Sequence, residues 1–113
     1  MKKINVDLFK DVKLLYVEDD LMTQEEVSYF LKKYVKELYV AKNGEEGLEL
    51  FLNNKIDMVI TDIQMPKMNG LEMSKRILEI NPNMPIAITT AYSDADYLIK
   101  AIELGIDKYI LKP

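Results

Sequence analysis

The chain of 113 residues contains no cysteine, no histidine and no tryptophan. The absence of cysteine excludes disulfide bonds and thiolate metal sites. The absence of histidine removes the most common general base and the most common metal ligand. Any metal that binds here must therefore be a hard cation that prefers oxygen ligands.

The chain also lacks long apolar runs and clustered positive charge. No run approaches the roughly 18 apolar residues of a membrane span, and the segment MKKINVDLFKDV has no stretch suited to a signal peptide. The formal net charge is −4, and Lys and Arg form no block. We therefore expect a cytoplasmic domain that binds neither nucleic acid nor membranes directly.

Two alternating patterns are present in a chain whose length and 49% apolar content fit one globular domain. Segments with the apolar spacing of helices lie between short apolar segments rich in β-branched or aromatic residues. The clearest helical stripe runs from Val27 to Val35. The short segments predict buried parallel strands, at 13–17 (KLLYV), 37–41 (ELYVA), 58–61 (MVIT), 86–90 (IAITT) and 109–111 (YIL).

Turn and capping residues separate the predicted elements. Asn43-Gly44 opens the second helix, Gly70 opens the third, and Ser93 with Asp96 resembles a capping box at the start of the fourth. Gly105 falls where the fourth helix is expected to end.

Alternating strands and helices predict an α/β fold, a doubly wound parallel sheet of five strands with helices on both faces. Only four helices are predicted, so we expect a domain at 13–113 that is truncated before a fifth helix and any output domain. Residues 1–12 form an N-terminal extension. Either its Ile4, Leu8 and Val12 stripe or a second protomer is expected to cover the sheet face left open.

Acidic and polar residues follow four of the five strands. Ligands of open α/β sheets bind at the carboxyl ends of the strands, where the third strand delivers Asp62, the fourth Thr89-Thr90 and the fifth Lys112. The first strand ends in Glu18-Asp19-Asp20. Each has an ordinary explanation alone, such as helix capping or a solvated lysine. Together they predict one crevice that holds carboxylates, a hydroxyl and an ammonium group.

These motifs resemble the receiver domain of response regulators in two-component phosphorelay systems. The resemblance runs from about Lys13 to Pro113. It rests on four motifs in order: the acidic cluster 18–20, TDIQMPKMNG around Asp62, Thr90-Ala91, and YILKP at 109–113. It implies a flavodoxin-like sheet with strand order 2-1-3-4-5. Glu18 stands where aspartate is more frequent in the family, and Lys67 where many members carry glycine.

The resemblance also implies the roles of the site residues. Asp62 would accept a phosphoryl group from a histidine on a partner kinase or phosphotransfer protein, which accounts for the missing histidine. Mg²⁺ would be held by Asp19, Asp62, the backbone carbonyl of Gln64 and, through a water, Glu18. The role expected for Asp20 is capping of the first helix.

A conformational switch is part of the same expectation. Lys112 and Thr90 would contact the phosphoryl oxygens, and movement of Thr90 would let Tyr109 turn inward. The domain would then act as a signalling switch rather than an enzyme. It would control an output domain beyond residue 113 or a partner, and a homodimer is a further expectation.

Two other functions stay open. A degenerate receiver would only mediate protein contacts, but Asp19, Asp62, Thr90 and Lys112 are all present. A Mg²⁺-dependent hydrolase on a related fold typically has Asp-x-Asp after a strand, whereas Gln64 follows Asp62 at that spacing.

Overall fold

The computed structural model describes residues 9–90, 95–106 and 108–111, and it leaves the side chains of 90, 95, 97, 98 and 109–111 undescribed. Strands and helices alternate through this part of the chain. The elements are β1 (Lys13–Val17), α1 (Leu21–Leu31), β2 (Glu37–Ala41), α2 (Gly44–Asn53), β3 (Met58–Asp62), α3 (Gly70–Ile80), β4 (Ile86–Thr90), α4 (Ala95–Glu103) and β5 (Lys108–Leu111).

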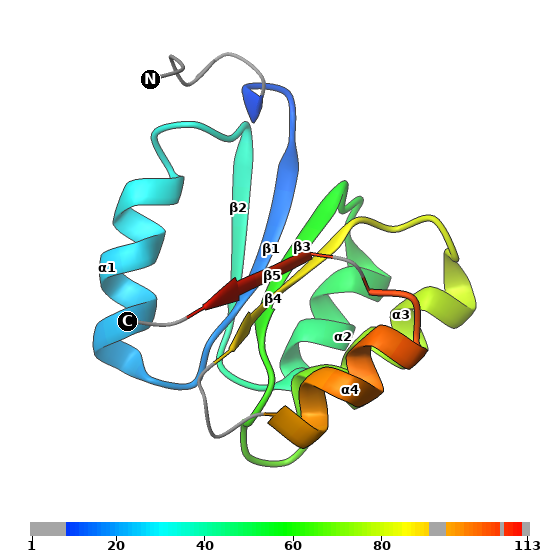
Figure 1. Ribbon diagram of the computed structural model, residues 1–113. Helices are drawn as coiled ribbons and strands as arrows, with labels where there is room; N and C mark the ends of the chain where they lie inside the picture. Colours follow the sequence, from blue (N-terminus) through cyan, green and yellow to red (C-terminus); the bar gives the residue numbers. More distant parts are fainter. Residues whose placement is uncertain (1–8, 91–94, 107, 112–113) are drawn as a thin grey trace, which may run out of the picture.

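All five strands form one parallel sheet in the order β2-β1-β3-β4-β5. Helix α1 lies on one side of the sheet, and α2, α3 and α4 lie on the other (Figure 1). The predicted doubly wound fold and its strand order are therefore confirmed. The predicted strand bounds are also confirmed, except that β3 continues to Asp62 and β5 begins at Lys108.

Three helices begin at a side-chain cap. The side chain of Asp20 accepts a hydrogen bond from the Thr23 amide at the start of α1. Asn43 caps α2 and Asn69 caps α3 in the same way, which satisfies amide donors that have no partner within the helix. Gly105, with φ of 90°, follows α4 as predicted. Ser93, which was expected to cap α4, lies outside the described residues.

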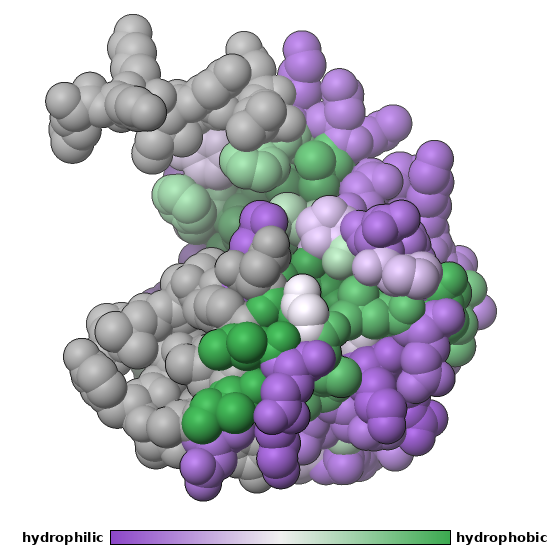
Figure 2. Space-filling view, turned by 45° about the vertical axis from the view of Figure 1, so that its right-hand side comes forward, coloured by the Kyte–Doolittle hydropathy of each residue, from purple (hydrophilic) through white to green (hydrophobic). Residues whose placement is uncertain are grey.

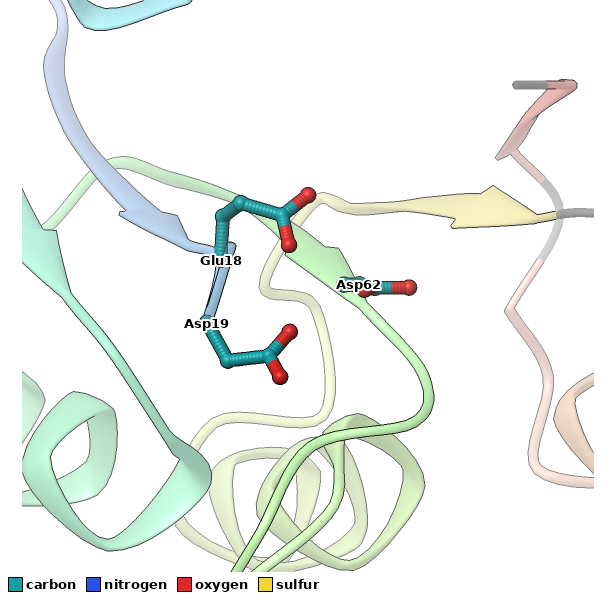
Figure 3. A group of neighbouring side chains, drawn as sticks. All are labelled: Glu18, Asp19 and Asp62. Atoms are coloured by element: carbon teal, nitrogen blue, oxygen red, sulfur yellow. The ribbon is translucent and has the colours of Figure 1, made fainter. Parts of the chain in front are cut away.

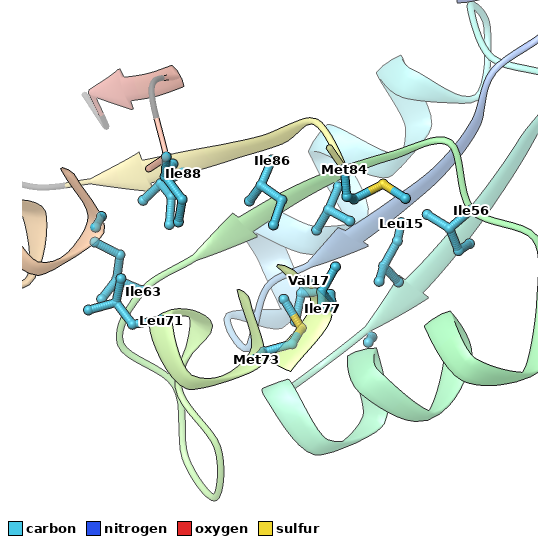
Figure 4. Packing of buried hydrophobic residues seen from close by; sticks show 14 residues of the cluster. Leu15, Val17, Ile56, Ile63, Leu71, Met73, Ile77, Met84, Ile86 and Ile88 are labelled. Atoms are coloured by element: carbon cyan, nitrogen blue, oxygen red, sulfur yellow. The ribbon is translucent and has the colours of Figure 1, made fainter. Parts of the chain in front are cut away.

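The main core fills the space between the sheet and helices α2, α3 and α4. Figure 4 shows Val17 of β1 and Ile86 and Ile88 of β4 among side chains of α3 and its preceding loop. These strand residues are almost completely buried. This core fixes the strands against one helical layer, so the carboxyl ends of β1 and β3 become a rigid edge on which a site can be built.

Two helical stripes differ from the predicted ones. Helix α1 ends at Leu31, and the chain continues in turns in which the Tyr34 amide bonds to the Leu31 carbonyl. On the fourth helix, apolar spacing predicts a buried stripe of Leu98, Ile99, Ile102 and Leu104. Leu104 packs against the core, but Ile99 and Ile102 are each 57% exposed, and Ala101 is buried in α4. The prediction is therefore wrong for Ile99 and Ile102.

An apolar groove lies on the α1 side of the sheet. Its volume is about 250 Å³, and its walls include Phe9 and Val12 from the N-terminal segment, Leu14 and Ile60 from the sheet, and Tyr34. In Figure 2 apolar residues gather around a hollow of the surface. Val12 thus lies where the predicted N-terminal stripe would cover the sheet, while the rest of that stripe, Ile4 and Leu8, lies outside the described residues.

Candidate functional site

Three carboxylates meet at the carboxyl edge of the sheet. Glu18 and Asp19 follow β1 directly, and Asp62 is the last residue of β3. Val17 at the end of β1 pairs with Thr61 of β3 in the parallel ladder, so the next residues, Glu18 and Asp62, come at the same level of the sheet edge. Their carboxylate oxygens and one from Asp19 all lie within 4.8 Å of one another (Figure 3). The predicted convergence of Glu18, Asp19 and Asp62 is therefore seen.

Two of the three carboxylates are almost completely buried. Glu18 is 1% exposed and Asp62 is 5% exposed, whereas Asp19 lies at the surface. Asp62 Oδ1 accepts a hydrogen bond of 2.7 Å from the Ile63 amide, and Glu18 Oε2 accepts one of 3.1 Å from the Asp20 amide. These bonds orient the carboxylates but leave like charges close together, which is unfavourable away from bulk water.

The negative potential at this edge reaches a neighbouring phenol. Burial raises the pKa of the Tyr16 hydroxyl, and the charges of Glu18, Asp62 and Asp20 raise that pKa further. Tyr16 therefore stays neutral over the physiological range. The edge is thus a concentrated negative site inside the fold rather than a set of separately solvated acids.

The donor set fits a hard divalent cation. Three carboxylates supply oxygens only, and Mg²⁺ or Ca²⁺ takes oxygen ligands. A cation would also offset the repulsion within the cluster, because it places a positive charge among the carboxylates. The residues present therefore suit a metal of this class, reached from solvent on the exposed side of Asp19.

Asp20 is oriented away from this role. Its Oδ2 accepts hydrogen bonds from the amide of Thr23 at 3.0 Å and from the Thr23 hydroxyl at 2.5 Å. The side chain is exposed and is not part of the cluster of three carboxylates. The expected role of Asp20 as the cap of the first helix is confirmed.

The loop from β3 to α3 folds back tightly onto the end of the strand. The Gly70 amide donates a 2.8 Å hydrogen bond to the Ile63 carbonyl, and Asn69 Oδ1 accepts one of 2.9 Å from the Glu72 amide. Gln64 lies in this loop, two residues after Asp62, and is exposed. The loop therefore brings Gln64 to the same edge, while its backbone carbonyl as a metal ligand stays a prediction.

Two further predicted residues, Thr90 and Tyr109, have a described backbone in the neighbouring strands. Thr90 ends β4, directly after Thr89, which pairs with Asp62 in the ladder. Tyr109 is in β5 and pairs with Ile88. The side chains of Thr90 and Tyr109 and the whole of Lys112 lie outside the described residues, so their predicted contacts stay predictions.

The start of α2 contributes support that the sequence motifs did not reveal. The Gly44 amide donates a 2.8 Å hydrogen bond to the Met68 carbonyl, which ties the start of α2 to the β3–α3 loop. A β-carbon on Gly44 would collide with that carbonyl. In the sequence Asn43-Gly44 indicates only a helix start, although a glycine is also the residue that permits close backbone approach.

Within the described residues, no helix is both long and apolar enough to cross a membrane. The family model "Response regulator receiver domain" matches residues 14–113. Among curated relatives, a cyclic di-GMP phosphodiesterase of Thermotoga maritima is 36% identical over 100 residues, which are 88% of this chain and 27% of that protein. The transcriptional regulatory protein CusR of Escherichia coli is 34% identical over 102 residues, 90% of this chain and 45% of CusR. The chain thus spans less than half the length of either relative.

Solved structures agree with the family model. A response regulator receiver domain protein from Clostridium thermocellum superimposes with a TM-score of 0.83 at 34% identity, covering 90% of this chain and 82% of that one. A chain from the CheX–CheY–BeF3–Mg²⁺ complex of Borrelia burgdorferi gives 0.81 at 27% identity, covering 97% and 84%. The sheet order, the three carboxylates and the extent of these matches agree, and the chain belongs to the response regulator receiver domain family.

Proposed function

We propose that this receiver domain accepts a phosphoryl group on Asp62 in a reaction that requires Mg²⁺. The observation that carries the proposal is the convergence of Glu18, Asp19 and Asp62 within 4.8 Å at the carboxyl edge of the sheet. A similar chain was solved in a complex that contains Mg²⁺, which favours that cation over other hard cations.

The chemistry follows from the position of Asp62. One carboxylate oxygen attacks the phosphorus of the donor, a bond from that oxygen to phosphorus forms, and the bond from phosphorus to the donor's leaving atom breaks. The leaving group, a histidine imidazole of a kinase or the acetate of acetyl phosphate, keeps the electron pair of the broken bond. The Ile63 amide, which donates to Asp62 Oδ1, holds the carboxylate in one orientation during the attack.

Asp19 and Asp62 would hold Mg²⁺ directly, together with the Gln64 carbonyl, and Glu18 would act through a water. The cation, when bound, would neutralise phosphoryl oxygens that the carboxylates otherwise repel. Thr90 and Lys112 would contact the other phosphoryl oxygens, and Tyr109 would follow the movement of Thr90. The order of the strands supports this assignment: β4, which ends at Thr90, lies next to β3, and β5, which Lys112 follows in the sequence, lies next to β4.

The biological setting is part of the same proposal. The phosphodonor would be a sensor histidine kinase or a phosphotransfer protein. The output would lie in a further domain, since this chain covers 27% of one relative and 45% of another. A cytoplasmic location fits a relative named as a transcriptional regulator. We propose a signalling switch rather than an enzyme with a separate substrate.

Incubation with acetyl phosphate and Mg²⁺, followed by intact-mass measurement, tests the proposal. We expect a gain of one phosphoryl group in the wild type and in Asp57→Asn, because Asp57 lies at the other end of β3 beside Lys13. We expect no gain in Asp62→Asn. An unmodified wild type would indicate the degenerate receiver, and sustained hydrolysis of phosphate esters would indicate the hydrolase.

A further inference from the structure

The side chain of Gln24 joins the first acidic loop to the end of the second strand. Its Nε2 donates hydrogen bonds to the Glu18 carbonyl at 2.9 Å and to the Ala41 carbonyl at 3.2 Å. An amide NH₂ carries two hydrogens, and two carbonyl acceptors use both. Two carbonyls also fix the orientation of the amide, because the opposite orientation would set its oxygen against two acceptors.

The same contacts hold Glu18 from both sides. The Glu18 amide donates a 3.0 Å hydrogen bond to the Ala41 carbonyl, which also accepts from Gln24. The Glu18 N–H is thus bonded directly to the Ala41 carbonyl of β2, and the Glu18 carbonyl is linked to that same carbonyl through the Gln24 side chain. The peptide that contains the Glu18 carbonyl is the one that joins Glu18 to Asp19, so its plane sets the direction of both carboxylates.

Helix α1 does not need this side chain for its own start. Asp20 already caps the helix through the Thr23 amide, and the Gln24 backbone amide bonds to the Asp20 carbonyl at 2.8 Å. The Gln24 side chain instead reaches out of the helix to two carbonyls at the ends of β1 and β2. Its contacts serve the acidic loop rather than the helix.

We propose that Gln24 is a positioning residue of the metal site, which it serves by fixing the peptide between Glu18 and Asp19. Gln24 contacts neither the cation nor the phosphoryl group. The inference rests on the proposed function, since it presumes a divalent cation at Glu18, Asp19 and Asp62. It also gives β2 a part in the site, although that strand supplies no ligand.

The test is titration with Mn²⁺, followed by water-proton relaxation, with Mg²⁺ as competitor. Gln24→Met keeps the length of the side chain but loses both donors. We expect it to bind Mn²⁺ about tenfold more weakly, the lower end of the losses caused by removing groups that orient metal ligands. Gln24→Arg keeps N–H donors at similar reach and should recover part of the loss, although its positive charge opposes cation binding.

Asn54→Leu is the matched control. Asn54 Nδ2 also donates to a backbone carbonyl, that of Leu50, at 3.0 Å, but it lies at the end of α2 away from the site. Asn54→Leu should lower the melting temperature, measured without metal, by about as much as Gln24→Met does. Unlike Gln24→Met, it should leave the affinity for Mn²⁺ unchanged.

The outcomes separate this inference from the proposed function. Wild-type protein that binds no Mn²⁺ or Mg²⁺ would overturn both. Wild-type binding with equal affinity in Gln24→Met, or an equal loss in Asn54→Leu, would overturn the role of Gln24 alone. If Gln24→Met does not fold, Gln24→Leu, which also loses both donors without a change of charge, replaces it. Undiminished Mn²⁺ affinity in Gln24→Leu would then overturn the inference.

Discussion

Gly70 lies directly against the backbone of Asp62. A β-carbon on Gly70 would collide with the Asp62 carbonyl oxygen and would come within 3.0 Å of the Thr61 hydroxyl oxygen. That hydroxyl donates a 2.8 Å hydrogen bond to the same carbonyl. Gly70, the first residue of α3, thus leaves room for the end of β3 because it has no β-carbon. The position of Asp62 depends on this room.

Gly70→Ala is therefore expected to displace Asp62. Overpacking of this kind costs about 1–3 kcal/mol of unfolding free energy, and the shifted carboxylate should bind Mg²⁺ more weakly and accept phosphate more slowly. Chemical denaturation and Mn²⁺ titration measure the two effects.

Gly105→Ala is the control for the Gly70 variant. Gly105 has φ of 90° but open space around its missing β-carbon. The alanine should be strained and less stable, yet it should keep its metal affinity. Undiminished affinity in Gly70→Ala would contradict the dependence of Asp62 on this contact.

Removal of one carboxylate should stabilise the metal-free protein. Glu18, Asp19 and Asp62 repel one another while no cation is bound, so Asp62→Asn is expected to melt at a higher temperature than wild type without metal. Wild type should gain roughly 2.7 kcal/mol at a Mg²⁺ concentration about 100 times Kd. Asp62→Asn should gain little.

Thermal melts with chelator and with Mg²⁺ measure this effect. Glu79→Gln, an exposed carboxylate near the end of α3, should behave as wild type in both conditions. A lower melting temperature for metal-free Asp62→Asn would count against repulsion within the cluster.

Substitution of Asp20 should affect stability, whereas substitution of its neighbour Asp19 should affect metal binding. Asp20→Ala removes the cap of α1 and should cost about 1 kcal/mol of unfolding free energy, whereas Asp20→Ser keeps a capping oxygen and should restore most of it. Both variants should still bind Mg²⁺, unlike Asp19→Ala. Loss of metal binding in Asp20→Ser would show that Asp20 is a ligand.

Much of the fold follows from the sequence because buried parallel strands leave short, dense apolar segments. Four strand starts match this pattern, and the second and third helices begin at Gly44 and Gly70 as predicted. The ends of helices are less certain: the stripe through Tyr34 and Val35 continues α1 in sequence, but the chain leaves the helix at Leu31. On α4 the small residue Ala101 is buried while larger residues are exposed, a choice set by close packing rather than by hydropathy.

The sequence predicts the side chains that form the site, but it does not predict the contacts to backbone groups that hold them in place. Asp62, Asp19 and Glu18 could be found from their places after strands. Gln24 and Gly44 act on carbonyl groups of distant residues, which no local pattern reveals. Gly47 is similar: glycine weakens a helix, but a β-carbon there would come within 2.6 Å of the Met73 sulfur, so the Met73 side chain would have to shift.

Lys67 offers a route to a more stable domain. It has φ of 66° in the β3–α3 loop, a region that side chains with a β-carbon adopt only at a cost. Lys67→Gly should raise the unfolding free energy by about 1 kcal/mol. The same change on a helix, Lys75→Gly in α3, should lower it by about 1 kcal/mol. Denaturant unfolding of both variants tests the sign, and a destabilised Lys67→Gly would contradict the strain.

The most direct test of the account is to locate the phosphoryl group after reaction with acetyl phosphate and Mg²⁺. Peptide mapping of the modified protein should place it on the peptide that contains Asp62, and hydroxylamine should remove it because an aspartyl phosphate is a reactive acyl phosphate. A phosphoryl group that resists hydroxylamine, or that maps to any other residue, would contradict the assignment of Asp62 as the acceptor.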